Sequence, residues 1–347
     1  MIAYRVLVVT NLWPYAKDPS YGCFVQAQME SLRPLGVDFD LLFVNGRESR
    51  WNYVHGVYAL RRRLRGGRYD LIHAHMGLSG WVARCQLRIP LVVSFMGNDV
   101  PGKVDRRGRT TLLGCLFEVS SLILARLADA VIVKSLPMRR RLRLDSAHVI
   151  PNGVDTILFR PGDRAETRRV LGLDPGKQYV LFPYSPAVPG KRYDLVEAAV
   201  LLARECIPEL EILPVMQAPQ SRMPLYMNAA DVMVIASMQE GSPNSVKEAL
   251  AVNLPVVSVD VGDVADLLRS TEGNYIVERK PEIIAEKIVE VCRRGQRSDS
   301  RNRIVEHLSL EQVAKRIVQV YASVIKPNPL SPPQLSTADR EQQVQLK

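Results

Sequence analysis

The stretch Ala236-Ser-Met-Gln-Glu-Gly-Ser-Pro-Asn-Ser-Val-Lys-Glu-Ala-Leu-Ala-Val-Asn-Leu-Pro-Val-Val257 decides the fold class. It continues the apolar run 231–236, which predicts a buried parallel strand, and goes on as a tight loop, a helix and another strand. Ser242 and Pro243 are predicted to be the N-cap and the first residue of that helix. A helix that begins just past the carboxyl end of a parallel strand points free N–H groups into a crevice, where phosphate-bearing ligands bind.

Two carboxylates in this stretch are the leading candidates for a binding site. Glu240 lies on the predicted loop and Glu248 on the predicted helix. Two glutamates at this spacing are common on the solvated face of any helix. They could also meet the two ends of a nucleotide diphosphate ligand, one of them at its ribose. The Gly-Ser-Pro loop, the preceding Asn228-Ala-Ala-Asp231 and the following Leu254-Pro-Val-Val257 favour the ligand.

With these flanks, the segment resembles the donor-sugar signature of the retaining glycosyltransferases of family four, in which seven residues separate two glutamates. The resemblance implies the GT-B fold, an α/β architecture of two doubly wound Rossmann-like domains that face each other across a cleft. It also implies that Glu240 holds hydroxyls of the donor sugar and Glu248 holds the ribose. The other donor-binding residues that it implies on this stretch are Gly241, Ser242, Asn244, Ser245 and Val246.

The rest of the chain alternates strand and helix patterns in two series. Strands are predicted at 5–10, 38–44, 71–74, 91–95 and 130–133, and again at 180–183, 211–214, 231–236, 256–259 and 275–277. Helices are predicted at 25–35, 55–65, 79–87, 111–128, 135–143, 192–204, 243–252, 281–294 and 310–325. Such alternation predicts parallel sheets that are covered by helices on both faces. We therefore expect a domain at 1–160, a second, nucleotide-sugar-binding domain at 161–309 and a ligand cleft between them.

The junction and the end of the chain also follow the resemblance. Pro151-Asn-Gly-Val-Asp155, with Phe159 four residues on, resembles the interdomain signature of the family, and we interpret it as a hinge marker. In the family the last helix, here 310–325, crosses back onto the first domain. Residues 326–347 begin with prolines and continue with polar residues, which predicts a disordered tail.

Lys191 and Arg192 stand at the predicted beginning of a helix in the second domain. They could form an ordinary basic helix start, although positive charge opposes the helix dipole there. Cations at this place would instead stabilise the charge that develops on a departing diphosphate. By resemblance Lys191 is the lysine that the family uses for this purpose, and Arg192 a further donor-binding cation. The family's arginine, five residues before the lysine, is replaced by Pro186.

The first domain offers a weaker set of candidates at its strand ends. His73 and His75 resemble a pair that lines the cleft in family members. A histidine here could also be a satisfied core residue, and we expect this of one of the two. The next strand end resembles a motif that usually reads His-Gly-x-Asp, in which the histidine contacts the donor sugar; Met96 takes its place here. The polar candidates that remain for the acceptor or sugar pocket are Asn98 and Asp99, and Gly22 resembles the glycine of the first phosphate-facing loop.

Composition limits the class of protein. Of the 347 residues, 47% are hydrophobic and 24% are charged, which is typical of a soluble globular chain long enough for two domains. The apolar runs are too short to span a bilayer, and Met1 leads directly into a strand, so we expect no signal peptide. Five scattered cysteines favour a reducing cytoplasm over a disulfide framework.

The net charge of +10 is concentrated in two runs, 61–68 and 139–143. Three interpretations remain open. The runs could be a solvated face, could attract an anionic inner-membrane surface or a lipid-linked acceptor, or could bind nucleic acid. Nucleic acid is the weakest of the three, because no aromatic residues or recognition motif accompany the runs.

Together these features predict a retaining glycosyltransferase that moves a sugar from a nucleotide diphosphate sugar to an acceptor hydroxyl, in the biosynthesis of a glycan, polysaccharide or glycolipid. None of the cysteines has metal-ligand spacing with a histidine. Glu240 and Lys191 are its predicted catalytic residues. The alternative is a nucleotide-sugar-binding protein or partner subunit whose catalysis is weakened by Met96 and Pro186. A dinucleotide-dependent oxidoreductase is disfavoured, because no Gly-x-Gly-x-x-Gly follows the first strand.

The resemblance implies a reaction that needs no metal ion and no cofactor beyond the nucleotide sugar itself. In this family retention is explained by attack of the acceptor hydroxyl on the face that the diphosphate leaves, with a phosphate oxygen taking the proton. Neither an Asp/Glu nucleophile nor a metal is then required. We see no Asp-x-Asp metal motif in a suitable loop of the sequence.

Overall fold

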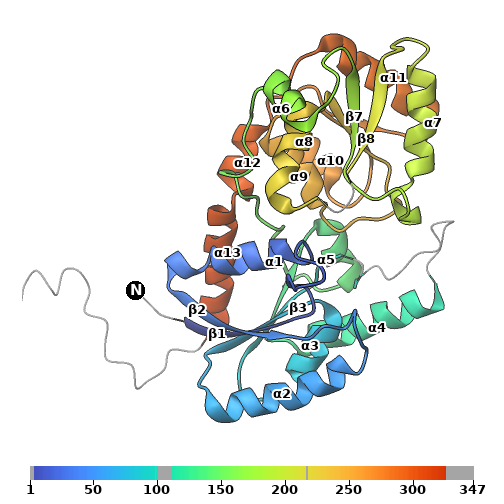
Figure 1. Ribbon diagram of the computed structural model, residues 1–347. Coiled ribbons are helices and arrows are strands. Elements are labelled where there is room, and N and C mark those ends of the chain that lie inside the picture. The colour runs from blue at the N-terminus through green and yellow to red at the C-terminus, as the bar shows by residue number, and fades with distance from the viewer. Residues whose placement is uncertain (1–3, 98, 101–110, 216–217, 326–347) are drawn as a thin grey trace, which may run out of the picture.

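The computed structural model describes residues 4–97, 99–100, 111–215 and 218–325. Two parallel sheets, each with helices on both faces, lie one above the other in Figure 1. The α/β class and the two doubly wound units predicted from the sequence are confirmed. Asn98 and the tail 326–347 lie outside the described residues.

The first sheet has six parallel strands in the order β2-β1-β3-β4-β5-β6. Their bounds are β1 (Tyr4–Thr10), β2 (Val37–Phe43), β3 (Leu71–His75), β4 (Leu91–Ser94), β5 (Ala130–Val133) and β6 (His148–Val149). The first five match the predicted strands closely, because long apolar runs mark strands that are buried on both faces. Its helices are α1 (Cys23–Glu30), α2 (Asn52–Gly66), α3 (Gly77–Arg84), α4 (Leu112–Leu127) and α5 (Leu136–Leu142).

One predicted helix of the first domain was wrong in its extent. The helix expected at 25–35 is α1, which ends at Glu30, followed by a separate 3-10 turn, η1 (Arg33–Leu35). Pro34 explains the break, because it has no N–H to donate to the carbonyl of Glu30. The predicted end at Gly36 is confirmed, since Gly36 has a φ of 84° and closes the turn.

The second sheet has five parallel strands in the order β11-β10-β9-β7-β8. They are β7 (Gln178–Phe182), β8 (Leu210–Pro214), β9 (Val232–Ile235), β10 (Val256–Val259) and β11 (Tyr275–Val277). The predicted helices are confirmed as α7 (Tyr193–Ala203), α9 (Asn244–Ala251) and α11 (Pro281–Arg294). Four helices that were not predicted from the sequence have at most eight residues each: α6 (Arg164–Leu171), α8 (Met223–Ala229), α10 (Val264–Leu268) and α12 (Arg301–Leu308).

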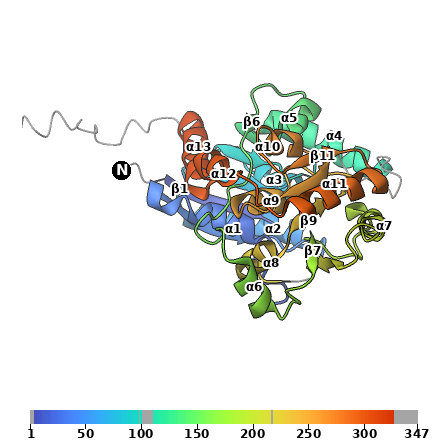
Figure 2. The same ribbon diagram turned by 90° about the horizontal axis from the view of Figure 1, so that it is seen from above.

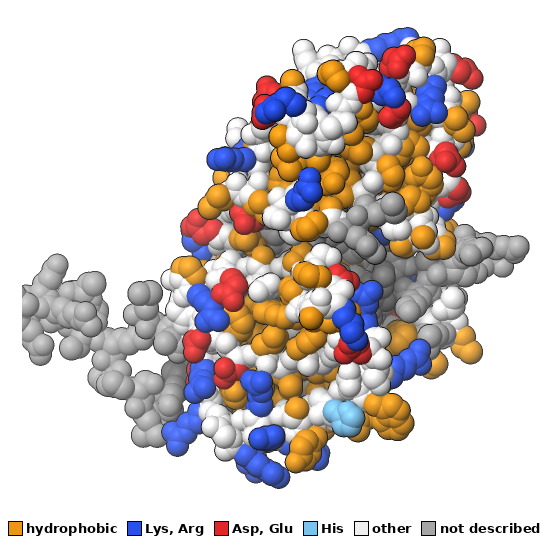
Figure 3. Space-filling view, in the orientation of Figure 1, with side chains coloured by type: hydrophobic (Ala, Val, Ile, Leu, Met, Phe, Trp, Pro, Cys, Tyr) orange, Lys and Arg blue, Asp and Glu red, His pale blue; other side chains and the backbone are white. Residues whose placement is uncertain are grey.

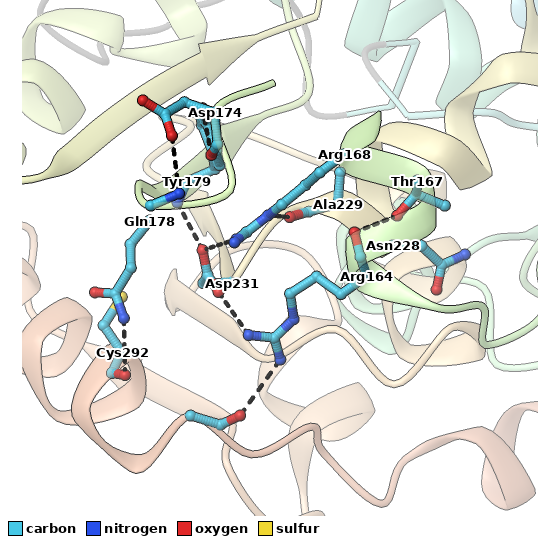
Figure 4. Close-up of polar contacts among 12 residues, drawn as sticks. Arg164, Thr167, Arg168, Asp174, Gln178, Tyr179, Asn228, Ala229, Asp231 and Cys292 are labelled. Atoms are coloured by element: carbon cyan, nitrogen blue, oxygen red, sulfur yellow. Dashed lines mark hydrogen bonds and ion pairs between the residues drawn. The ribbon is translucent and has the colours of Figure 1, made fainter. Parts of the chain in front are cut away.

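A buried ion cluster joins α6 to the second sheet (Figure 4). The Asp231 carboxylate, at the beginning of β9, accepts hydrogen bonds from Arg164 Nη1 at 2.7 Å and Arg168 Nη2 at 2.6 Å. It also accepts the backbone N–H of Tyr179 at 2.7 Å. Because each oxygen of this buried carboxylate has partners, Asp231 fixes α6 against the amino-terminal edge of the sheet, on the side away from the cleft.

The last helix, α13 (Leu310–Val324), lies against α1 and the first sheet (Figure 1). Its buried side chains, among them Ile317 and Tyr321, share one core with Val6 and Val8 of β1. The connection after β6 meets the junction of α12 and α13, where Val154 exchanges backbone hydrogen bonds with Leu308 and Leu310. The chain therefore passes between the domains twice, and the two crossings are bonded to each other.

No helix in the described ranges combines the length and apolarity needed to cross a membrane.

Candidate functional site

A cavity of about 280 Å³ lies where the two domains meet at the carboxyl ends of their strands. Its first-domain wall consists of Phe24, Met96 and Gly97, and Asn152 reaches it from the interdomain connection. Its second-domain wall is formed by Tyr184, Lys191, Glu240, Gly241, Ser242, Pro243, Asn244 and Ser245. The cavity thus brings together Lys191, Glu240 and four of the predicted donor-binding residues of the loop and helix start.

Two glycines bring the domains into close contact at this cavity. A Cβ atom built on Gly241 would lie 2.8 Å from the Cα of Gly97, which belongs to the opposite domain. Behind it, a Cβ atom on Gly262 would lie 2.8 Å from the carbonyl oxygen of Gly241. Real Cβ atoms do not approach that closely, so the backbone of the loop is held between two other backbone segments with no room for a side chain.

Lys191, Glu240 and Tyr184 form the charged centre of the cavity. Lys191 Nζ contacts Glu240 Oε1 as an ion pair and lies 3.9 Å from the centre of the Tyr184 ring. The Tyr184 hydroxyl is 2.9 Å from Ser245 Oγ and donates to Glu240 Oε1 at 3.4 Å. Burial, and then the charge of Glu240, raise the pKa of Tyr184 well above its ordinary value. Tyr184 therefore keeps its proton and acts as a hydrogen-bond donor.

Tyr184 was not predicted from the sequence as a site residue. Its only sequence signal is its place two residues beyond the end of β7, where a side chain faces the cleft edge of a parallel sheet. Its contacts with Glu240 and Ser245 span 56 and 61 residues.

The beginning of α9 differs from the prediction by one residue. The N-cap is Pro243 and the first helical residue is Asn244, so Ser242 is not the cap. Pro243 has an extended ψ of 121°, and helical conformation therefore begins only after it. No side chain caps this helix end, which leaves the N–H groups of its first turn, beside the cavity, without a capping acceptor. The Val246 side chain is fully buried in the core, so Val246 has only its backbone to offer a ligand.

Glu248 lies one to two turns along α9, outside the residues that line the cavity. Its Oε1 accepts a hydrogen bond from Gln220 Nε2 at 2.7 Å, and Gln220 Oε1 in turn is 3.6 Å from Cys23 Sγ of the first domain. Burial raises the pKa of the Glu248 carboxyl to about 7, against the lowering effects of Gln220 and Lys247. The surroundings of Glu248 therefore stabilise its charged form poorly.

Gly22 stands beside this contact, immediately before Cys23. It has a φ of 70°, and a Cβ atom on it would lie 2.3 Å from the carbonyl carbon of Leu12. The first domain therefore requires glycine here for its own backbone packing. Gly22 is not among the residues that line the cavity.

A buried lysine next to Glu248 joins the helix to the interdomain connection. Lys247 is fully buried, and its Nζ donates to the backbone oxygen of Asn152 at 2.9 Å. Burial lowers the pKa of Lys247 to about 8, although Asp263 and Glu248 act in the opposite direction. Asn152 Nδ2 also donates to Asn244 Oδ1 at 3.3 Å. Lys247 was not predicted from the sequence as a buried residue. Its only signal there is its place between the buried Val246 and Ala249 on a short helix.

His73 does not line the cavity, contrary to the interpretation that both histidines face the cleft. It is fully buried between the Tyr321 hydroxyl, 2.6 Å from Nδ1, and Ser94 Oγ, 2.8 Å from Nε2. Burial lowers the pKa of His73 to about 3, so it is a neutral core residue. The reason is α13, which crosses back and supplies Tyr321 to the face of the sheet on which His73 lies.

His75 and Asp99 are also buried, and neither lines the cavity. His75 Nε2 lies 3.5 Å from Gln28 Nε2, and burial lowers the pKa of His75 well below its ordinary value. The Asp99 carboxylate accepts the backbone N–H groups of Met96 at 3.0 Å, Gly97 at 2.9 Å and Gly77 at 3.2 Å. Asp99 therefore shapes the loop that carries Met96 and Gly97 instead of facing a ligand in this cavity.

Arg192, predicted as a donor-binding cation, does not face the cavity. It has a left-handed φ of 56°, and its Nη2 pairs with Asp194 at 2.8 Å at the beginning of α7. The left-handed turn at Arg192 separates its side chain from that of Lys191. In the described part of the chain, no group of three or more His, Cys, Asp or Glu side chains is arranged to hold a metal ion.

Comparison with known proteins gives a consistent result for both halves of the chain. Residues 3–158 match the sequence profile of glycosyltransferase family 4, and residues 196–294 match that of the glycosyl transferases of group 1. A D-inositol 3-phosphate glycosyltransferase of Nocardia farcinica is 29% identical over 259 residues, which are 61% of this chain and 56% of the relative. The chain thus spans little more than half the length of that relative.

Two further proteins cover more of the chain. TuaC of Bacillus subtilis, which is named as a teichuronic acid biosynthesis glycosyltransferase, is 23% identical over 346 residues, 82% of this chain and 88% of TuaC. HepE of Anabaena, solved in complex with UDP-glucose, superposes with a TM-score of 0.68 at 15% identity and covers 92% of this chain and all of HepE. The similarity to such structures shows the GT-B fold.

Proposed function

Because the chain belongs to glycosyltransferase family 4, we propose that it transfers a sugar from a nucleoside diphosphate sugar to an acceptor hydroxyl, with retention of the anomeric configuration. The observation that carries the proposal is the Lys191–Glu240 ion pair inside the interdomain cavity. A cation and a carboxylate there match the two ends of such a donor, a diphosphate that accepts hydrogen bonds and a sugar whose hydroxyls donate them.

The residues of the cavity have distinct roles in this proposal. Lys191 binds the diphosphate and offsets the negative charge that builds up as the bond to the sugar breaks. The uncapped N–H groups at the beginning of α9 bind the same phosphates. Glu240 accepts hydrogen bonds from the sugar hydroxyls, and the Tyr184 hydroxyl orients Glu240. Beyond the residues that line the cavity, Glu248 accepts the ribose hydroxyls in place of Gln220.

The proposed chemistry takes place on one face of the sugar. The bond between the anomeric carbon and the diphosphate oxygen breaks, and the acceptor oxygen forms its bond to that carbon from the same side. The proton of the acceptor hydroxyl passes to a phosphate oxygen of the leaving nucleotide. No protein nucleophile and no metal ion takes part, since Lys191 and the helix N-terminus carry the stabilising charge.

Donor binding is tested first, by thermal shift with UDP, GDP and ADP and with their glucose or mannose conjugates. UDP-glucose is the first choice, because HepE was solved with it. Wild-type protein should be stabilised by one nucleotide class, while Glu248→Ala should unfold normally and lose most of that shift. An undiminished shift in Glu248→Ala would remove the ribose assignment.

Transfer is tested with the preferred donor and with acceptors chosen from the relatives. Inositol phosphate and polysaccharide fragments are the first two classes, since relatives are named for them, and product is followed by proton NMR at the anomeric position. The same anomeric configuration in donor and product supports retention. An inverted product would refute it.

A second candidate function is a nucleotide-sugar-binding subunit with weakened catalysis. Met96 favours it, because an apolar thioether lines the cavity where the family motif usually has a histidine, and Pro186 takes the place of the family's arginine. Tight nucleotide binding without hydrolysis or transfer over a broad acceptor panel would establish this alternative.

A further inference from the structure

Helix α4 carries a row of apolar side chains on its outer surface. They are Leu112, Leu116, Val119, Ile123 and Leu127, and between 46% and 82% of each is exposed. Their spacing of three or four residues places them on one face of the helix. Figure 1 shows α4 extending beyond the body of the first domain. Single exposed leucines need no explanation, but a continuous row over four turns marks a contact surface.

Helix α2 presents a second row with a different character. Trp51, at its N-cap, and Val54 and Tyr58 are 72%, 59% and 71% exposed, at the same helical spacing. The row continues along the helix with Arg61, Arg62 and Arg65, which are exposed as well. Trp and Tyr favour the boundary between water and lipid, because each has an apolar body and a polar tip.

Both rows belong to one layer of the first domain. The crossover connections of β2 to β3, β3 to β4 and β4 to β5 run in one direction across the sheet, so right-handed crossovers put α2, α3 and α4 on the same face. Helix α3 contacts both of its neighbours, and α5 contacts α4. Helices α1 and α13 cover the opposite face (Figures 1 and 2). We call the layer α2–α5 the basic layer.

The charge of the basic layer is almost entirely positive. Its four helices hold nine arginines, four on α2, three on α5 and one each on α3 and α4. They hold a single carboxylate, Glu118, which is paired with Arg141 at 2.5 Å. A merely solvated face normally mixes both signs, as α11 does in the second domain. In Figure 3, blue and orange side chains gather along the lower edge, over α2.

We propose that the basic layer docks the protein on an anionic lipid bilayer, with the apolar rows of α2 and α4 entering the headgroup region and the arginines meeting lipid phosphates. This combination of exposed aliphatic and aromatic side chains with arginines is that of helices that lie in a membrane interface. The charge disfavours a second copy as the occupant, because a two-fold interface would place this surface against itself. The proposal does not depend on the proposed transfer reaction.

The test is co-sedimentation of the full chain with phosphatidylcholine vesicles, with and without phosphatidylglycerol, at low and high salt. The protein should bind only the anionic vesicles, and added salt should weaken binding. Arg61→Glu/Arg62→Glu should lower the partition coefficient by more than about fivefold per arginine. Leu116→Gln/Val119→Gln should lower it by about tenfold or more, since each side chain loses its burial in lipid.

Matched controls come from the second domain. Leu201→Gln removes a 58% exposed leucine from α7, and Arg293→Glu reverses an exposed arginine at the end of α11. Both should bind vesicles as the wild type does, and all variants should keep the wild-type melting temperature. A further readout is tryptophan fluorescence, which should shift to the blue on vesicle addition in the wild type but not in Trp51→Phe.

Three results would overturn the proposal. One is failure of anionic vesicles to retain the wild-type protein at low salt. Another is equal retention of the wild type and the variants of the basic layer. The third is a concentration-dependent dimer, seen by light scattering, that Leu116→Gln/Val119→Gln abolishes while vesicles bind neither protein, since the apolar row would then be a self-association surface.

Discussion

Lys247 Nζ donates a hydrogen bond of 2.9 Å to the backbone oxygen of Asn152, and both residues are buried. Lys247 belongs to α9 of the second domain, and Asn152 to the connection between the domains. Asn152 also reaches Asn244 at the beginning of α9 and lines the interdomain cavity. The interdomain connection is therefore bonded to the helix whose N-terminus forms the proposed diphosphate site.

Lys247→Met should destabilise the protein more at high pH than at pH 7. The folded-state pKa of Lys247 is lowered to about 8, so the folded protein releases a proton between pH 8 and the ordinary value of 10.5 and gains stability as the pH rises. Above pH 8 the neutral amine of Lys247 still donates a hydrogen bond to the backbone oxygen of Asn152 in the wild type. In the methionine variant this buried oxygen loses that donor. Urea unfolding at pH 10 should show a loss of about 1–3 kcal/mol, and a smaller loss at pH 7.

Lys280→Met is the control for this experiment. Lys280 is exposed and its ion-pair partner is the exposed Glu278, so its loss should leave the stability close to that of the wild type at either pH. An Lys247→Met effect that does not vary with pH would contradict the perturbed titration of Lys247.

Glu248→Gln should stabilise the empty protein above pH 7 while weakening donor binding. The folded-state pKa of Glu248 is raised to about 7 from an ordinary value of 4.5, so the wild type loses stability as the pH rises from 4.5 to 7. Glutamine does not titrate and avoids this loss. Thermal melting should favour the variant by about 1–3 kcal/mol at pH 8 and show little difference at pH 4.

The same substitution should weaken donor binding while it raises stability, so the effect of Glu248 on binding can be separated from its effect on folding. If Glu248 accepts ribose hydroxyls, the nucleotide should bind the glutamine variant more weakly at pH 8 by calorimetry, even though that variant is the more stable protein. A variant that is less stable than the wild type at pH 8 would show that the Glu248 carboxylate already has adequate partners in the empty site.

Lys191→Ala and Arg192→Ala should differ sharply although the residues are neighbours. Lys191 lies in the cavity against Glu240, whereas Arg192 pairs with Asp194 outside it. Loss of the proposed diphosphate cation should lower kcat/KM for transfer by roughly 10²–10³-fold. Arg192→Ala should keep full activity and lose about 0–1 kcal/mol of stability. Equal losses of activity in both variants would mean that the helix start as a whole, and not Lys191, serves the donor.

The strands could be predicted from the sequence because their signal is local. An apolar run such as 231–236 identifies a buried strand without knowledge of its neighbours, and Gly36 marks a helix end in the same way. Short helices such as α10, with five residues, have too few turns to show a helical period.

The site could be predicted only where one segment of sequence contains it. The loop and helix around Glu240 are contiguous, and Lys191 was located by a single motif. Tyr184 and Lys247 were missed because contacts across the fold give them their surroundings. His73 shows the limit most clearly, since its environment is decided by Tyr321, 248 residues further along the chain.

Gly241→Ala should impair donor binding and turnover far more than stability. The new Cβ atom would lie 2.8 Å from Gly97 Cα and 3.2 Å from Met138 Sδ, and both of these atoms belong to the first domain. Moving the domains apart relieves that contact without disturbing either core, at the expense of the cavity between them. Calorimetry should show nucleotide affinity reduced by about tenfold or more, a change of about 1.4 kcal/mol, while the melting temperature barely changes.

Gly190→Ala is the matched control for Gly241→Ala, because Gly190 adjoins Lys191 in the same cleft and a Cβ atom on it meets nothing within 4 Å. It should bind nucleotide as the wild type does. Small-angle scattering adds an independent measurement: Gly241→Ala should have a larger radius of gyration than the wild type, and Gly190→Ala should not. If Gly241→Ala keeps both the wild-type radius and the wild-type affinity, the loop relaxes within its own domain. The close approach of Gly97 and Gly241 would then have no part in forming the donor site.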